Sequence, residues 1–112
     1  MVRIGTRIAI VTLLVTGTCL PANAQQSTSV TVNYRNHRFQ PAEIQVPANV
    51  PVQLRLKNLD STPLEFESVS LRVEKVVTGN SEGVIRIRAL APGRYEFFDD
   101  FHPETRGVLV AK

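Results

Sequence analysis

Cysteine and histidine are scarce in this sequence, and their scarcity excludes several kinds of chemistry. The 112 residues include one cysteine, Cys19, and two histidines, His37 and His102. Two histidines are too few for a three-histidine zinc centre, and no serine occupies a nucleophile-elbow motif. None of the six glycines belongs to a phosphate-cradling loop. The composition therefore gives no support to ordinary hydrolytic catalysis.

The first 24 residues have the three parts of a cleaved secretory signal. Arg3 and Arg7 make the beginning basic, residues 8–15 are almost wholly apolar, and residues 20–24 close with an Ala-x-Ala pattern. The apolar run is too short to span a bilayer as a permanent helix. We therefore expect cleavage after Ala24, export to the periplasm, and a single domain over residues 25–112.

Cys19 leaves one alternative open. Bacterial lipoprotein signals also place a cysteine at the cut, usually after a glycine or an alanine, whereas Thr18 precedes Cys19 here. We expect soluble export rather than a lipid anchor. If Cys19 leaves with the signal, the exported chain has no cysteine, and it can form no disulfide and offer no thiolate to a metal.

The sequence also lacks a strong excess of one charge. The formal net charge is +3 at pH 7, and removal of Arg3 and Arg7 with the signal leaves about +1 (3 − 2). A nearly neutral domain has no electrostatic footprint for nucleic acid.

Apolar and polar residues alternate with a period of two along the rest of the chain, which is the pattern of half-buried β-strands. The alternating runs are residues 30–35, 43–47, 52–57, 64–67, 84–89, 93–98 and 107–110, with turn residues between them. Residues 70–76 fit either a strand or a short turn that leads into one. About seven or eight short strands at this spacing predict an all-β fold, an antiparallel β-sandwich.

Side chains of the metal-ligating type are concentrated near the C-terminus. Asp99, Asp100, His102 and Glu104 lie within six positions, between the runs 93–98 and 107–110. A loop between two strands is where a β-sandwich presents functional groups, because the strands fix the ends of the loop. Oxygen and imidazole donors gathered there predict a metal site.

Five pieces of sequence, in this order along the chain, resemble the cupredoxin family. They are Phe39-x-Pro41-x-x-Ile44-x-Val46-Pro47-Ala48, Val52-x-Leu54-x-Leu56-x-Asn58, Asp60-Ser61-x-Pro63, Pro92-Gly93-x-Tyr95-x-Phe97 and Gly107-x-Leu109-Val110. Residues 71–75 and 98–103 are most similar to cupredoxin-like proteins of bacterial periplasmic iron-uptake systems, including the small partner proteins of iron permeases. The resemblance implies a Greek-key β-sandwich with its metal at one end, between two loops.

The chain departs from this family at the metal ligands. A blue-copper site needs two histidines, a cysteine thiolate and usually an axial methionine. The family's places for these ligands fall on Leu64, Asp99, His102 and Thr105, so that only the histidine remains. Without a sulfur ligand, the resemblance implies the fold and the place of the site but no blue-copper electron transfer.

Strand alternation supplies two further candidate ligands, since Glu65 and Glu67 share one face while Leu64 and Phe66 take the other. If the cupredoxin topology holds, the two glutamates lie beside the acidic loop. The candidate metal ligands are therefore Glu65, Glu67, Asp99, Asp100, His102 and Glu104. Such a set suits iron, manganese or a non-blue copper(II) better than copper(I).

Each candidate also has a role that needs no metal. The two glutamates can form the solvent-exposed face of an edge strand, and the aspartates can cap a turn. His102 can pack on Phe101, and Glu104 can simply face solvent. We do not expect His37 to be a ligand, because it lies between Arg35-Asn36 and Arg38, an environment that disfavours a cation.

Together these observations predict a periplasmic accessory protein of iron acquisition. It would bind an iron ion, or alternatively a copper ion, and pass it to an iron permease or another periplasmic uptake protein, with residues 97–102 as site and docking surface. Two alternatives stay open. One is a copper-dependent ferroxidase component of the same uptake system, and the other is a metal-free protein-interaction module.

Overall fold

The computed structural model describes residues 5, 9–18 and 28–112, and within these residues nine strands form two sheets. The strands are β1 (Thr28–Arg35), β2 (Arg38–Gln40), β3 (Glu43–Val46), β4 (Val52–Asn58), β5 (Leu64–Ser68), β6 (Val73–Val77), β7 (Ser81–Ile87), β8 (Gly93–Asp99) and β9 (His102–Ala111). Residues 70–76, which fitted either a strand or a turn leading into one, contain both. A turn over residues 69–72 leads into β6.

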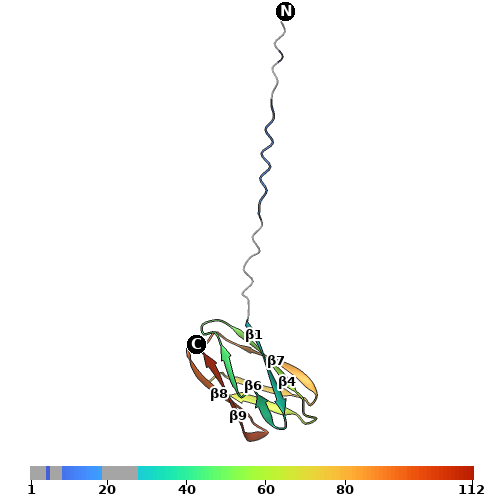
Figure 1. Cartoon of the computed structure of the whole chain (residues 1–112), viewed down its shortest axis with the longest axis vertical. Coiled ribbons are helices and arrows are strands. Elements are labelled where there is room, and N and C mark those ends of the chain that lie inside the picture. Colours follow the sequence, from blue (N-terminus) through green and yellow to red (C-terminus); the bar gives the residue numbers. More distant parts are fainter. Residues whose placement is uncertain (1–4, 6–8, 19–27) are drawn as a thin grey trace, which may run out of the picture.

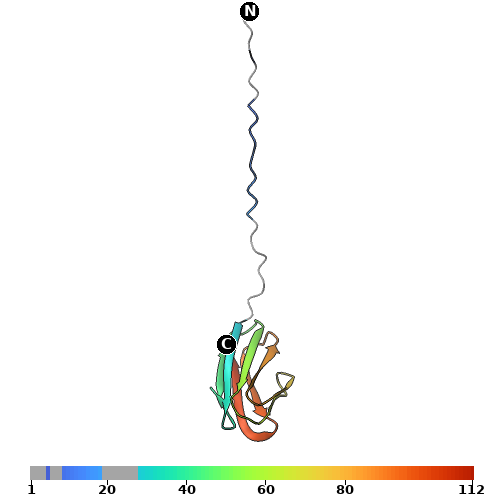
Figure 2. The same ribbon diagram turned by 90° about the vertical axis from the view of Figure 1, so that its right-hand side faces the viewer.

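The two sheets pack face to face as a sandwich (Figures 1 and 2). One sheet has the order β2-β1-β4-β7, and the other has the order β3-β9-β8-β5-β6. The predicted β-sandwich is confirmed, with one difference: β1 pairs with β4, and β3 with β9, in parallel. The chain passes to the other layer between β2 and β3 and returns before β4, and such crossovers permit parallel neighbours that hairpins do not.

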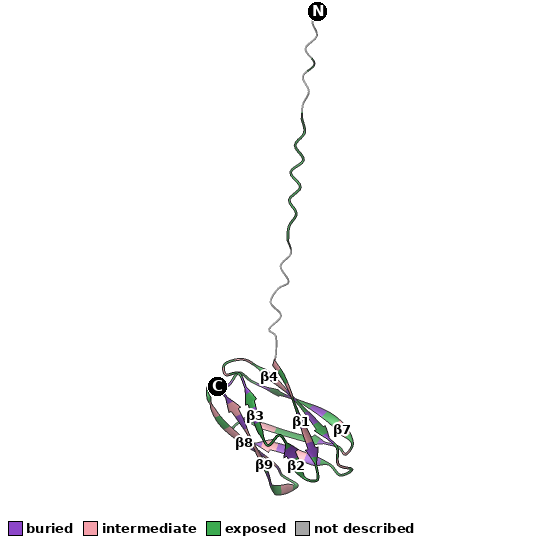
Figure 3. Cartoon of the chain, in the orientation of Figure 1, coloured by how far each residue is buried: buried purple, intermediate pink, exposed green. Residues whose placement is uncertain are grey.

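The core lies between the sheets and is built from the inward side of each alternating strand (Figure 3). Three phenylalanines from both sheets meet at its centre. The ring of Phe97 stacks on Phe66 with centroids 4.8 Å apart, and Phe39 meets Phe97 edge-on at 4.9 Å. These aromatic contacts anchor β5 and β8 next to each other, and that adjacency positions the candidate site.

The predicted alternation of β5 is confirmed. Leu64 and Phe66 are buried in the core, whereas Glu65 and Glu67 lie on the outer face and are partly exposed. β5 pairs with β8 in an antiparallel register that sets Glu67 opposite Phe98. The outer face of β5 therefore lies beside the C-terminal end of β8.

The connection from β8 to β9 is tighter than the predicted loop. β8 continues to Asp99 and β9 already begins at His102, so that only Asp100 and Phe101 form the turn. The pairing then passes from Asp99–His102 to Phe98–Arg106, which leaves residues 103–105 as an irregularity in β9. This bulge separates Glu104 from the turn that carries Asp100.

The predicted signal segment lies largely outside the described residues, and so does its cleavage site at Ala24. Its described part, residues 9–18, has no regular secondary structure. Within the described residues, no helix has the length and apolar character needed to cross a membrane.

Candidate metal centre

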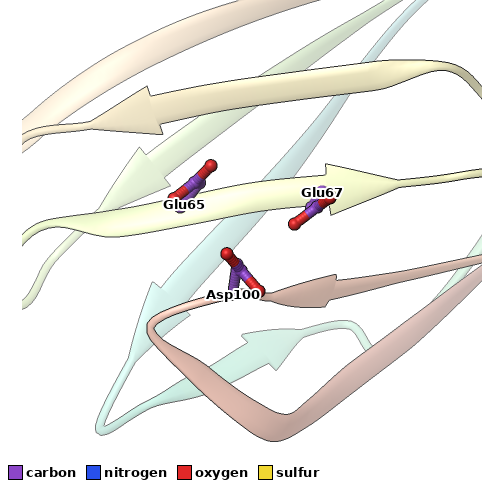
Figure 4. Close-up of side chains that lie close together, drawn as sticks. All are labelled: Glu65, Glu67 and Asp100. Carbon is purple, nitrogen blue, oxygen red and sulfur yellow. The ribbon is translucent and has the colours of Figure 1, made fainter.

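Three carboxylates meet on the outer face of the five-stranded sheet. Oxygens of Glu65, Glu67 and Asp100 all lie within 4.8 Å of one another. Figure 4 shows the two glutamates on β5 and Asp100 beside them at the end of β8. The backbone amide of Asp100 donates a 2.8 Å hydrogen bond to the carbonyl of Glu65, which fixes the turn against β5. Two segments far apart in the chain thus supply one acidic group.

A fourth carboxylate, Glu74 on β6, completes this acidic cluster. Glu74 lies opposite Glu67 across the β5–β6 pair. The hydrogen bond that Glu65 shares with Glu74, partial desolvation and the repulsion of the neighbouring acids raise the pKa of Glu65 to about 7. Partial desolvation, with repulsion from Asp100 and Glu74, also raises the pKa of Glu67. These neighbours therefore favour the protonated form of Glu65 up to a higher pH than in an isolated carboxylic acid.

An arrangement of this kind can bind a cation. Carboxylate oxygens are the ligands of hard and borderline ions such as iron(III), iron(II) and manganese(II). A bound cation replaces the shared proton and removes the repulsion between the acids, so binding must compete with protonation. The outward position leaves the remaining coordination places to water or to a partner.

Asp99, the residue before this turn, is held by the fold itself. Its side chain is fully buried, and each of its oxygens accepts two hydrogen bonds. Oδ1 accepts from the amides of Glu65 and Phe101, both at 3.0 Å. Oδ2 accepts from the hydroxyl of Tyr34 and from Nδ1 of His102, the latter at 3.1 Å. These bonds occupy the lone pairs that a cation would need.

The charge of this buried carboxylate is nevertheless stabilised. Burial by itself raises the pKa of Asp99, but the hydrogen bonds from Tyr34, the Glu65 amide, His102 and the Phe101 amide hold the pKa below its usual value. The Tyr34–Asp99 hydrogen bond has the opposite effect on the tyrosine. Burial and the Asp99 carboxylate raise the pKa of the Tyr34 hydroxyl. Asp99 therefore ties β1, β5 and the β8–β9 turn together as an ion.

The other two predicted ligands lie outside the group of three carboxylates. His102 is bonded to Asp99 and its ring stacks against His37, with centroids 3.8 Å apart. Glu104 is exposed on the β9 irregularity and lines a hollow together with His37 and Arg38. Of the six candidates, the structure thus gathers Glu65, Glu67 and Asp100, and the ligand role of each stays a prediction.

Sequence reasoning gave no weight to two residues that belong to these arrangements. Glu74 was given little weight because Arg72 or Lys75 could form a salt bridge with it, yet strand pairing brings it to Glu67. His37 was excluded because arginines flank it, yet the fold brings its ring to His102. Neither neighbour is visible in the local pattern, although the alternation that places Glu65 outward would have placed Glu74 outward if β6 had been recognised.

The chain is similar to known proteins over most of its length. A family model described as a cupredoxin-like domain matches residues 6–111. An uncharacterised protein of Rickettsia prowazekii (strain Madrid E) is 38% identical over 82 residues, which cover 72% of this chain and 66% of that protein. The chain thus spans slightly less than two thirds of that relative's length.

Solved structures show the same fold at low sequence identity. The metal-binding domain of the Streptococcus pneumoniae D39 Cu(I)-exporting P-type ATPase CopA, with Cu(I), superposes with a TM-score of 0.65 at 17% identity, over 75% of this chain and 84% of that one. Auracyanin A, a blue copper protein of Chloroflexus aurantiacus, superposes with a TM-score of 0.64 at 15% identity, over 77% and 99%.

Proposed function

We propose, from the premise that this chain belongs to the family of cupredoxin-like domains, that it is a metal-binding member whose cation is held by oxygen rather than sulfur. Glu65, Glu67 and Asp100 are the proposed ligands, and iron is the proposed ion. The observation that carries this proposal is the meeting of these three carboxylates within 4.8 Å on one face.

The blue-copper site of cupredoxins does not fit this chain. Of the family's four ligand places, only His102 carries a ligand of that family. Leu64 is wholly buried and apolar, and Asp99 is committed to its own hydrogen bonds. Thr105 donates its hydroxyl to the carbonyl of His37 at 2.7 Å. Because no thiolate is present there, copper(I) and a blue copper(II) centre have no suitable ligand. The proposed ion therefore binds at the acidic cluster instead.

The raised pKa of Glu65, about 7, supports a site that loads and releases its ion. Near neutral pH the acidic cluster is poised between proton and cation, so a modest fall in pH favours release. This behaviour suits a carrier more than a permanent structural site. We accordingly propose that the protein acts in the periplasm and passes iron to a permease or another uptake protein.

Exposed apolar side chains beside the acids support contact with such a partner. Phe101 at the turn is 47% exposed, and Val76, which pairs with Glu65 across β5–β6, is 51% exposed. Within the predicted docking edge, residues 97–102, Phe97 instead lies in the core at 1% exposure. The proposed docking surface is therefore the acidic cluster with Phe101 and Val76.

Calorimetric titration of the metal-stripped protein tests the proposal. Iron(II) under anaerobic conditions, and manganese(II) as a redox-stable probe, should bind at or below micromolar concentrations at pH 7.5. Glu67→Gln and Asp100→Asn should each weaken binding by at least tenfold. The matched control is Glu96→Gln, an exposed acid on the outer face of β8 that does not belong to the group of three.

Failure of both ions to bind below about millimolar concentrations would favour the metal-free interaction module. Equal weakening by Glu96→Gln would show that only general surface charge attracts the cation. The ferroxidase alternative is separated by iron(II) oxidation assays with and without copper, because a carrier shows no copper-dependent rate.

A further inference from the structure

Strand β7 is an edge strand whose outer side is left unpaired. In the order β2-β1-β4-β7 it pairs only with β4, along all seven of its residues. Beyond that ladder, no backbone hydrogen bond joins β7 to the rest of the described chain. Figure 3 shows β7 at the right-hand margin of the sandwich. A row of peptide N–H and C=O groups therefore faces outward and can pair with another strand.

β7 lacks the features that usually protect an edge strand from pairing. Such edges are commonly very short, or they carry a proline or a bulge. The opposite edge of the same sheet, β2, has only three residues. β7 has seven residues without a proline, and its register against β4 is regular from end to end. Its central side chain, Val84, is apolar and 41% exposed. A regular edge of this length suits the addition of a further strand.

The outward side chains of β7 are self-complementary. Glu82, Val84 and Arg86 are exposed along one face, and Gly83 and Ile85 between them are buried. When a second β7 adds antiparallel with Val84 on the two-fold axis, Glu82 of each copy lies opposite Arg86 of the other. The two Val84 side chains then meet. Directly opposite residues on one face are the pairs that stabilise antiparallel sheets, and a two-fold interface requires a pattern of this kind.

A shift of the two-fold axis by one residue removes this match. With the axis at Gly83, Glu82 lies opposite Val84, and with the axis at Ile85, Arg86 lies opposite Val84. Either shift sets a charge against an apolar side chain. Of these three registers, the one centred on Val84 alone joins opposite charges and apolar side chains at once, so the sequence of β7 selects its own register.

Both charged residues are available for such a contact. Arg86 lies opposite Gln53 of β4 and has no acidic partner among the described residues. Glu82 accepts a 2.7 Å hydrogen bond from Nε of Arg55 through Oε1, which leaves Oε2 for a second donor. The same bond lowers the pKa of Glu82, so that its carboxylate is ionised at neutral pH. A guanidinium from a second copy would therefore complete a network of two arginines around Glu82.

The other cations of this face do not prevent the contact. Arg55 and Lys57 lie on β4, one strand further from the edge. Across the two-fold axis they are separated from their copies by three strand spacings, about 14 Å. Salt at physiological concentration largely screens exposed charges at that separation.

We propose that β7 is a dimerisation edge, which pairs antiparallel with β7 of a second copy about Val84 and joins the two four-stranded sheets into one. The contact is small, so we expect a weak dimer that forms and dissociates with concentration. β7 belongs to the four-stranded sheet, whereas the acidic cluster lies on the five-stranded one. The dimer therefore does not depend on the proposed metal centre.

Sedimentation velocity of the protein, from about 10 μM to about 1 mM, tests this edge. The native protein should shift from monomer towards dimer over this range. Arg86→Glu sets two acids opposite each other and should weaken the dimer at least tenfold, and Glu82→Arg does the same with two bases. The matched control is Arg38→Glu, the same change of charge on the same face but at the opposite edge strand, β2. Dimerisation of this control should equal that of the native protein.

The two variants should restore each other. One chain then offers two acids and the other two bases, so an equimolar mixture should form a mixed dimer although neither variant dimerises alone. Urea midpoints establish that each variant is folded. Glu82→Arg also loses the contact with Arg55, and Arg86→Glu alone carries the test if Glu82→Arg is unfolded.

A native protein that stays monomeric at about 1 mM would overturn the proposal. So would a native dimer that Arg86→Glu leaves unchanged, because the copies would then meet at another surface. A mixture of two folded variants that stays monomeric would exclude the register about Val84. Manganese(II) affinity should be unchanged in Arg86→Glu, and Glu67→Gln should leave the dimer intact, so this proposal and the metal centre fail separately.

Discussion

Replacing Glu74 by glutamine should remove most of the pH dependence of cation binding in weakly acidic solution. Glu74 lies beside the proposed ligands, and the hydrogen bond that it shares with Glu65 is the largest of the effects that raise the pKa of Glu65 to about 7. A glutamine of nearly the same shape donates its amide to the ionised Glu65 carboxylate instead. The pKa of Glu65 should then move back towards 4.5, the ordinary value of a glutamate.

The magnitude follows from competition between one proton and the cation. With a pKa of about 7, protonation of Glu65 weakens cation binding about 25-fold more at pH 5.5 than at pH 7.5. With an ordinary carboxylate pKa, the same two conditions differ by only about 10%. The raised pKa of Glu67 steepens the dependence in the native protein further.

Manganese(II) titrations at pH 5.5, 6.5 and 7.5, at constant ionic strength, measure this effect. Titrations at pH 6 in two buffers with different ionisation enthalpies should show about one proton released per ion in the native protein and far less in Glu74→Gln. A native affinity that does not change with pH would refute the shared proton. An equally steep dependence in Glu74→Gln would show that Glu74 is not its cause.

The raised pKa of Glu65 also determines how the stability of the metal-free protein changes with pH. The pKa of Glu65 is higher in the folded chain than in the unfolded chain. Its stabilising contribution to the free energy of unfolding is therefore fully present below pH 4.5 and is lost as pH rises through about 7. Urea midpoints of the metal-free protein should therefore fall over this window. Saturating manganese(II) should reverse the fall, because the cation takes the place of the proton.

Two further substitutions test how the fold supports the site. Tyr34→Phe leaves the buried Asp99 carboxylate one hydrogen bond short and should cost about 1.5–3 kcal/mol of unfolding free energy; a urea midpoint equal to that of the native protein would contradict this role. Gly107→Ala should cost about 1–3 kcal/mol, because the added Cβ overlaps the ring of Phe97 and lies 2.8 Å from the carbonyl of Ala42. An unchanged melting temperature in Gly107→Ala would contradict this and mean that β9 can shift at this point.

The fold was largely predictable because alternation is a local signal. Leu64 and Phe66 face the core as their pattern predicts, and the glutamates between them face outward. The short β2 was missed because three residues carry too little pattern. The parallel pairs were missed because the sequence of one strand does not state which distant strand lies beside it.

The candidate site was predictable only in part. The meeting of Glu65 and Glu67 with Asp100 followed from the resemblance to cupredoxins, which supplied the order of the strands. Asp99 has the same side chain as Asp100, and the sequence could not separate their surroundings. One step along the chain turns the first into the core, where Tyr34 and His102 bind it, and leaves the second at the surface.

The sequence by itself determined which side chains leave the core, because a strand turns successive residues to opposite faces whatever its neighbours are. Only the tertiary structure decided which outward residues meet. Strand pairing and turn geometry join segments that are remote in the chain, and they set Glu74 beside Glu67 and His37 against His102. Proximity of that kind arises from long-range register, and no local stretch of sequence contains it.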